Sequence, residues 1–185
     1  MATPASRARR EPPVRRALVM GLGNPLYGDD GFGVQAIAAF ARRFRCEPSV
    51  AAVDGGTGGL DLLAYLEEAS ELVLLDAVRG PGPPGTIVEL SAGELARRGG
   101  TLLSQHQVGL EEALGLALWR GRLPARAMLV GVVPGWLQLG TGLSPAVAAA
   151  LPEAVDRAAA WLRRWGVQVM EVPMGEGDRG NEGSA

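Results

Sequence analysis

The sequence has one cysteine, one histidine and no lysine, so all 18 of its basic residues are arginines. The lone Cys46 excludes an internal disulfide, which fits a reducing compartment, and we expect the protein to be cytoplasmic. No apolar run approaches the ~20 residues that a membrane-spanning helix requires, so no membrane partner is predicted. The 18 basic residues face 20 acidic ones, and the resulting net charge of −2 does not favour nucleic acid as a partner.

The length of 185 residues is typical of one domain with its own core. Hydrophobic residues make up 47% and charged residues 21%, which excludes a wholly disordered chain. Five arginines lie in residues 1–16, but the apolar segment that follows is too short for a signal peptide. We therefore expect a disordered Arg-rich arm over 1–16, a single α/β domain over 17–172 and a disordered acidic, Gly-rich tail over 173–185.

Between the two ends, short apolar runs alternate with stripes of helical spacing. This alternation predicts an α/β fold, a three-layer αβα sandwich with a twisted, mostly parallel five-stranded sheet flanked by helices on both faces. The run at 86–90 follows a Gly-Pro turn and is predicted to lie near an edge of the sheet. The predicted strands are 17–22, 49–53, 71–75, 86–90 and 127–133, and the predicted helices are about 34–41, 60–66, 107–119 and 144–165.

The last predicted helix has a clear start signal. Ser144 precedes Pro145, a pattern typical of a side-chain N-cap followed by proline at the first helical position. We expect the Ser144 hydroxyl to cap this helix.

In folds of this kind, ligands bind beyond the carboxyl ends of the strands, where the first loop here is Gly21–Gly33. Its opening Gly-x-Gly suggests a dinucleotide site. However, Leu26 occupies the position of the third glycine, and Pro25 removes a backbone donor from the phosphate-binding turn. The loop therefore does not favour a dinucleotide cofactor.

Acidic residues follow three of the predicted strands: Asp29 and Asp30 the first, Asp54 the second and Asp76 the third. Carboxylates gathered at one edge repel each other and resist desolvation, so the pattern indicates a cation, a positively charged partner or a raised pKa. For Asp29 and Asp54, a turn or capping role is an equally good interpretation.

His106 stands at the predicted start of a helix, where the helix dipole favours the neutral imidazole that can bind a metal. Together with two strand-end acids it would supply one nitrogen and two oxygen ligands with open positions. A structural role for a lone histidine is the alternative interpretation.

These segments resemble the motifs of the [NiFe]-hydrogenase maturation proteases, and they occur in the same order. The resemblance extends from about residue 17 to residue 165. Its motifs here are Gly21–Asn24, Asp29–Gly33, Asp54–Gly58, Leu75–Ala77 and Gln105–Leu110.

The resemblance implies an endopeptidase that removes a C-terminal extension from a hydrogenase large-subunit precursor once nickel has been inserted. By motif position, it assigns metal binding to Asp30, Asp76 and His106, with nickel recognised on the precursor and not necessarily present in the isolated protein. The family has Asp or Glu at position 30. The resemblance also implies that the turn Asp54, Gly55, Gly56 and Thr57 helps to seat the substrate.

Two mechanisms stay open. In one, the three ligands recognise nickel held by the precursor, so that cleavage waits for metal insertion. In the other, Asp30 or Asp76 is the catalytic general base that activates water while a metal polarises the peptide carbonyl, as in an aspartyl-type or metal-dependent peptidase. We expect a monomer, and the precursor is the predicted partner.

Two alternative functions are considered, a nickel-binding accessory protein and a peptidyl-tRNA hydrolase-like esterase. A nickel-binding accessory protein without peptidase activity would need the same three ligands. The opening Gly21–Pro25 also resembles the peptidyl-tRNA hydrolases, but such an esterase needs a catalytic histidine soon after this motif, and none precedes His106.

The remaining candidates are side chains near the same edge. Trp136 lies in a Gly-rich loop after the last predicted strand and is predicted either to grip the substrate or to anchor its loop. No Gly-x-Ser-x-Gly elbow occurs, and Ser104 has no sign of activation. Cys46 is expected in a loop after the first helix, far from the acids. We therefore predict that neither Ser104 nor Cys46 is a nucleophile.

Overall fold

The computed structural model describes residues 16–47, 50–91, 94, 108–124 and 126–173. Its main sheet has five strands in the order β3-β1-β4-β6-β5, of which β5 is antiparallel to its neighbour and the others are parallel. The predicted mostly parallel sheet is therefore confirmed, and so is the edge position of the 86–90 run. The strands are β1 (Ala17–Leu22), β3 (Val50–Gly56), β4 (Glu71–Ala77), β5 (Ile87–Ser91) and β6 (Arg126–Val132).

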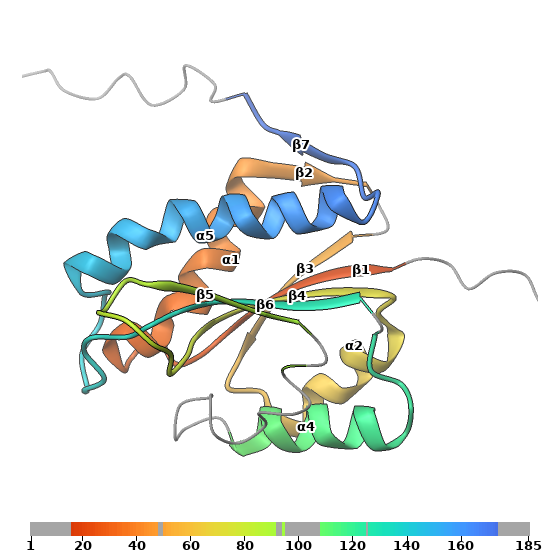
Figure 1. The fold of residues 1–185 in the computed structure, drawn as a ribbon, viewed down its shortest axis with the longest axis horizontal. Coiled ribbons are helices and arrows are strands. Elements are labelled where there is room, and N and C mark those ends of the chain that lie inside the picture. Colours follow the sequence, from red (N-terminus) through yellow and green to blue (C-terminus); the bar gives the residue numbers. More distant parts are fainter. Residues whose placement is uncertain (1–15, 48–49, 92–93, 95–107, 125, 174–185) are drawn as a thin grey trace, which may run out of the picture.

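Helices cover both faces of this sheet (Figure 1), as predicted for a three-layer sandwich. One face carries α1 (Phe32–Arg43) and α5 (Pro145–Arg164), and the other carries α2 (Leu63–Glu68) and α4 (Val108–Trp119). Alternate residues of each strand enter opposite cores, so Val73 packs with α1 and α5 while Leu74 packs on the α2 and α4 side. Every residue of β4 is buried because both of its faces are covered.

Most element bounds differ from the sequence prediction by one or two residues, and three of the differences concern the candidate acids and the helix predicted at 60–66. Strand β3 continues through Asp54 to Gly56, and β4 continues through Asp76 to Ala77, so both acids lie within strands and not just after them. The helix predicted at 60–66 is a 3-10 turn, η2 (Gly59–Leu62), followed by α2. Strand β3 is longer than predicted because its backbone pairs with β1, and β4 is longer because its backbone pairs with β6. The polar residues at the ends of the apolar runs do not reveal this pairing.

A second, two-stranded antiparallel sheet pairs β2 (Phe44–Cys46) with β7 (Val169–Glu171) beyond the end of α1. The apolar pattern of the sequence did not predict this sheet. Cys46 therefore lies in a strand, and its expected loop position is wrong.

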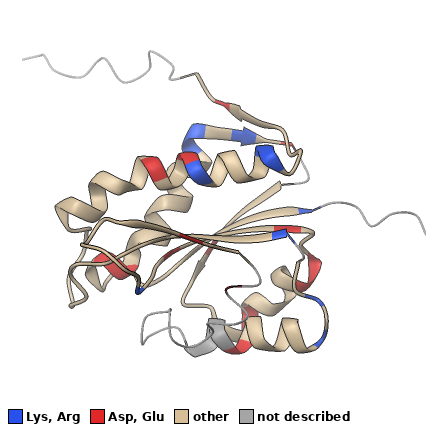
Figure 2. Cartoon of the chain, in the orientation of Figure 1, with Lys and Arg blue, Asp and Glu red and all other residues tan. Residues whose placement is uncertain are grey.

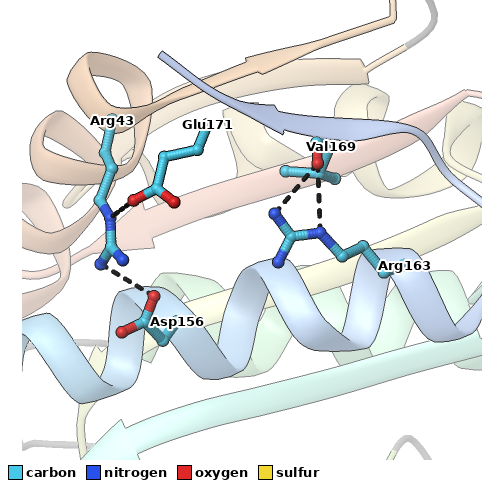
Figure 3. Close-up of polar contacts among 5 residues, drawn as sticks. All are labelled: Arg43, Asp156, Arg163, Val169 and Glu171. Atoms are coloured by element: carbon cyan, nitrogen blue, oxygen red, sulfur yellow. Dashed lines mark hydrogen bonds and ion pairs between the residues drawn. The ribbon is translucent and has the colours of Figure 1, made fainter. Parts of the chain in front are cut away.

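Polar contacts hold β7 against the helices (Figure 3). The Arg43 guanidinium bonds to Glu171 at 2.7 Å and to Asp156 at 2.8 Å. The Arg163 guanidinium donates to the Val169 carbonyl at 3.0 and 3.1 Å. These contacts join the chain's last described strand to α1 and α5.

Arginines lie in the last turns of α1 and α5, on the side of the molecule where β2 and β7 pair (Figure 2). Positive charge at a helix C-terminus is favourable because it opposes the negative end of the helix dipole. Among the described helices, none combines the length and apolar character needed to cross a membrane. The predicted arm over 1–16 and tail over 173–185 lie almost wholly outside the described residues.

Candidate functional site

The carboxyl ends of β1, β4 and β6 meet at one edge of the sheet. After β1 the chain makes a tight loop, residues 23–27, and a 3-10 turn, η1 (Gly28–Gly31), before α1. Gly23 has a φ of +117°, and a Cβ there would lie 1.8 Å from the Asp30 carbonyl oxygen. Only glycine allows the loop to fold back this closely, which brings Asp30 beside the strand it follows.

Asp30 is fully buried in η1. Its Oδ2 accepts a hydrogen bond from the Asn24 backbone N–H at 2.9 Å, and the Asn24 side chain forms its own turn by accepting from Leu26 N–H at 3.0 Å. Because η1 packs against β4, Asp30 comes from an element next to the strand that carries Asp76.

Asp76 is also fully buried, one residue before the end of β4. The preceding residue, Leu75, pairs with Gly21 of β1, so Asp76 lies where β1 turns into its loop. Its Oδ1 accepts from the Ala77 N–H at 2.7 Å. Strand alternation directs Asp76 to the face covered by α2 and α4. The structure thus brings Asp30 and Asp76 to the same edge, as the sequence analysis expected.

Asp29 has a different role from its neighbour. Its carboxylate is fully buried and accepts four hydrogen bonds from the loop after β6: Oδ2 from Gly135 N–H, Trp136 N–H and the Ser144 hydroxyl, each at 2.8 Å, and Oδ1 from Ser144 N–H at 2.6 Å. Hydrogen-bond donors therefore surround this anion, so its burial needs neither a cation nor a charged partner. Asp29 therefore has a structural role, as the alternative interpretation of the sequence allowed. However, its carboxylate joins two loops that are distant in the sequence and does not form a local turn.

Ser144 is the N-cap residue of α5 and Pro145 occupies the first helical position, as predicted. The expected side-chain cap is wrong, because the Ser144 hydroxyl donates to Asp29 and makes no capping bond. Sequence reasoning missed the Asp29–Ser144 pair. No local signal points to it, since the two residues are 115 positions apart.

Trp136 lies half-buried in the loop after β6. A Cβ at Gly28 would come within 2.7 Å of its indole, and one at Gly140 within 2.6 Å, so the ring packs against two glycines that have no side chain. This contact anchors the loop. Three neighbouring leucines stay exposed on the same two loops: Leu26 (58%), Leu137 (38%) and Leu139 (82%).

The Asp54–Thr57 turn lies at the edge strand β3. Asp54 is exposed, and its Oδ1 accepts from Gly56 N–H at 3.0 Å, which is a local turn. The Gly56 carbonyl accepts from Gly23 N–H at 2.9 Å, so this turn is joined to the loop that leads to Asp30.

His106 and Ser104 lie outside the described residues. Helix α4 is described from Val108 onward. Within the described part of the chain, no group of three or more His, Cys, Asp and Glu side chains is arranged to hold a metal.

Cys46 is remote from this edge. The twelve residues of α1 separate it from η1, a length of about 18 Å at 1.5 Å per residue. Burial raises the pKa of the Cys46 thiol, and the nearby positive charge of Arg163 only partly opposes this. A raised pKa keeps the thiol protonated, which agrees with the prediction that it is not a nucleophile.

Comparison with known proteins identifies the family of this chain. A family model described as "Hydrogenase maturation protease" matches residues 34–161. The hydrogenase expression/formation protein HupD of Rhizobium leguminosarum is 37% identical over 166 residues, which cover 89% of this chain and 82% of that protein. The hydrogenase 2 maturation protease of Escherichia coli is 35% identical over 156 residues, covering 84% and 95%.

Solved structures agree with these relatives. The hydrogenase maturating endopeptidase HybD from E. coli has a TM-score of 0.79 and 34% identity, covering 84% of this chain and 97% of that one. A [NiFe] hydrogenase maturation protease from Thermococcus kodakarensis has a TM-score of 0.64 and 29% identity, covering 78% and 97%. The family model, the E. coli relative and both solved structures are named as proteases or endopeptidases. The chain belongs to the hydrogenase maturation protease family and is an endopeptidase, a hydrolase of peptide bonds.

Proposed function

We propose that this endopeptidase removes the C-terminal extension of a [NiFe]-hydrogenase large-subunit precursor after nickel has been inserted. The observation that carries the proposal is the pair of fully buried carboxylates, Asp30 and Asp76, on adjacent elements at the carboxyl edge of the sheet. Burying a carboxylate costs folding free energy. Two buried carboxylates at one edge are therefore better explained by a catalytic or binding function there than by a contribution to stability. The T. kodakarensis neighbour, a [NiFe] hydrogenase maturation protease, agrees with this substrate class.

In this proposal, Asp30, Asp76 and His106 recognise the nickel that the precursor carries. Carboxylate oxygens and an imidazole nitrogen suit a borderline divalent metal such as nickel. Nickel belongs to the substrate here, so the isolated protein need not contain it. Contact with the loaded metal would make cleavage depend on its prior insertion, because an empty precursor lacks the group that the ligands bind.

Hydrolysis requires that water attack the carbonyl carbon of the peptide bond and that a base accept the water proton. Asp30 and Asp76 are the candidates for this base, and the proton then passes to the departing amine as the C–N bond breaks. Backbone N–H groups of Asn24 and Ala77 hold the two carboxylates in place, so they need little reorganisation before reaction. A metal at this position would additionally polarise the carbonyl oxygen.

The surroundings of the edge suit a polypeptide substrate. The Asp54–Thr57 turn and Trp136 are the proposed substrate contacts, and both connect directly to the loop of Asp30. The exposed leucines of the two loops add apolar surface for side chains of the bound segment.

The mass of a nickel-loaded large-subunit precursor, measured before and after incubation with the protein, tests the proposal. We expect loss of a C-terminal peptide from the loaded precursor and no change in a nickel-free control. Cleavage of both forms at equal rates would contradict the metal requirement. An unchanged mass in both samples, with a precursor from the same source as the enzyme, would contradict the proposed reaction.

A further inference from the structure

Asp29 has no assigned part in the proposed chemistry, although it directly precedes Asp30 in η1. Its carboxylate accepts four hydrogen bonds from the loop that carries Trp136 and leads to α5. The Asp29 carboxylate therefore connects the loop of Asp30, a candidate catalytic acid, to the loop of Trp136, a candidate substrate contact.

Backbone hydrogen bonds reinforce this connection. Asp29 N–H donates to the Trp136 carbonyl at 2.9 Å, Gly28 N–H donates to the Gly140 carbonyl at 2.8 Å, and Gly140 N–H donates to the Leu26 carbonyl at 3.0 Å. The two loops are thus joined along their length, with the Asp29 side chain at one end of the contact. They form one body that places Asp30 and Trp136 in a fixed relation.

The site is specific for an aspartate. Its partners are three backbone N–H groups and one hydroxyl, all of them donating, so the side chain must accept at both oxygens. An asparagine would turn an NH₂ group toward one of these donors. A glutamate would need room for an extra methylene at a fully buried position.

We propose that Asp29 is a positioning residue for the peptidase reaction, which fixes Asp30 and Trp136 relative to each other through the loop after β6. This inference rests on the proposed function, because it assumes that Asp30 acts on the substrate. A residue of this kind affects catalysis through geometry, and a displacement of about 1 Å can lower a rate by about 100-fold.

The test uses the full-length chain, a nickel-loaded precursor and the variants Asp29→Asn, Ser144→Ala and Ser144→Thr. Both kcat and KM are measured per folded molecule, at a temperature well below each variant's Tm. We expect Asp29→Asn to lower kcat by about 10- to 100-fold, more than it raises KM. Ser144→Ala removes one of the four bonds and should lower kcat less, while Ser144→Thr keeps the hydroxyl and should restore it.

A second measurement reports on the loops without any substrate. Amide hydrogen exchange in Asp29→Asn should accelerate either at Gly135 and Trp136, which share Oδ2, or at Ser144, which bonds to Oδ1, because one of the two oxygens becomes an NH₂ group. Exchange in β4 should stay unchanged. The matched control is Arg126→Ala, which removes the ion pair with buried Glu71 at the opposite end of β4. It should lower stability without changing kcat.

The possible failures are distinguishable. If the unmodified chain cleaves the precursor and Asp29→Asn keeps its kcat, the positioning role is wrong. The same conclusion follows if Arg126→Ala loses as much kcat as Asp29→Asn, since general destabilisation would then explain both. If the unmodified chain does not cleave, the proposed substrate is wrong, and unchanged amide exchange in Asp29→Asn would independently overturn the loop connection.

Discussion

Asp29 and Ser144 are 115 positions apart in the chain, yet the Asp29 carboxylate accepts hydrogen bonds from both the Ser144 backbone N–H, at 2.6 Å, and the Ser144 hydroxyl, at 2.8 Å. The first residue follows β1 and the second is the N-cap residue of α5. This contact gives a buried anion its donors and attaches the N-terminus of α5, which carries positive partial charge, to the loop of Asp30.

Replacing Asp29 with alanine should destabilise the protein by about 3–4 kcal/mol, because buried donors on the loop after β6 lose a charged acceptor. Urea unfolding followed by circular dichroism measures this. The matched control is Asp54→Ala, which removes a single exposed turn bond to Gly56 N–H and should cost about 1 kcal/mol or less. Equal losses for the two variants would contradict the assigned role of Asp29.

Gly28→Ala should displace the Trp136 indole, since a Cβ at this position would lie 2.7 Å from Cε3 of the ring. Gly142→Ala is the control, because Gly142 also has a positive φ but has no atom within 4 Å of an added Cβ. Both variants carry backbone strain, and overpacking should make Gly28→Ala less stable by a further ~1–3 kcal/mol. Urea unfolding and tryptophan fluorescence compare them. A fluorescence spectrum unchanged by Gly28→Ala alone would argue against the contact.

Asp76→Asn should abolish cleavage of the nickel-loaded precursor while leaving the fold intact. Asparagine keeps an oxygen that can accept from Ala77 N–H, but it removes the negative charge proposed to bind nickel or activate water. We expect a loss of at least about 100-fold in rate, the lower range for a general base. Circular dichroism verifies folding. A rate near that of the unmodified chain would exclude Asp76 from both mechanisms.

His106→Ala tests whether the imidazole takes part in nickel recognition, while both carboxylates stay in place. If the imidazole recognises nickel on the precursor, this variant should not process the loaded precursor, because one of three proposed ligands is lost. Mass spectrometry of the precursor measures processing. The nickel-free precursor should stay uncut by either protein, and processing by the variant at the unmodified rate would rule out metal recognition through His106.

Cys46 should react slowly with iodoacetamide in the folded protein. Burial raises the pKa of this thiol, so at pH 8 the folded chain holds less of the reactive thiolate than the unfolded chain does. A group whose pKa is raised on folding contributes stability that is complete below its unfolded pKa and is lost as the pH rises through the folded pKa. Stability should therefore decline above the ordinary thiol range, and Cys46→Ser should remove that part of the decline. Equal alkylation rates in folded and urea-unfolded protein at pH 8 would contradict this.

Much of the fold was predictable because its elements have strong periodic patterns. The run Ala17–Leu22 is entirely apolar and is a strand buried on both faces, and the stripe beginning at Val34 matches α1. The acids at the strand ends were also predictable as a group, since parallel strands place their carboxyl ends at one edge. Asp30 and Asp76 do lie at that edge, on elements that pack against each other.

Other features had no local pattern to reveal them. Strands β2 and β7 are three residues each, and they form only because positions 44–46 and 169–171 meet beyond α1. The two acids of the Asp29–Asp30 pair look alike in sequence, but their positions in η1 direct one carboxylate to the loop after β6 and let the other bond to Asn24.

The sequence by itself determined the alternation of strands and helices, the gathering of acids at one edge and the motifs shared with the hydrogenase maturation proteases, because each depends on residue type and spacing along the chain. The tertiary structure alone decided which acid is structural, where the Ser144 hydroxyl donates and how Trp136 is anchored. Most of these contacts join segments more than 100 residues apart, and no local preference encodes such contacts.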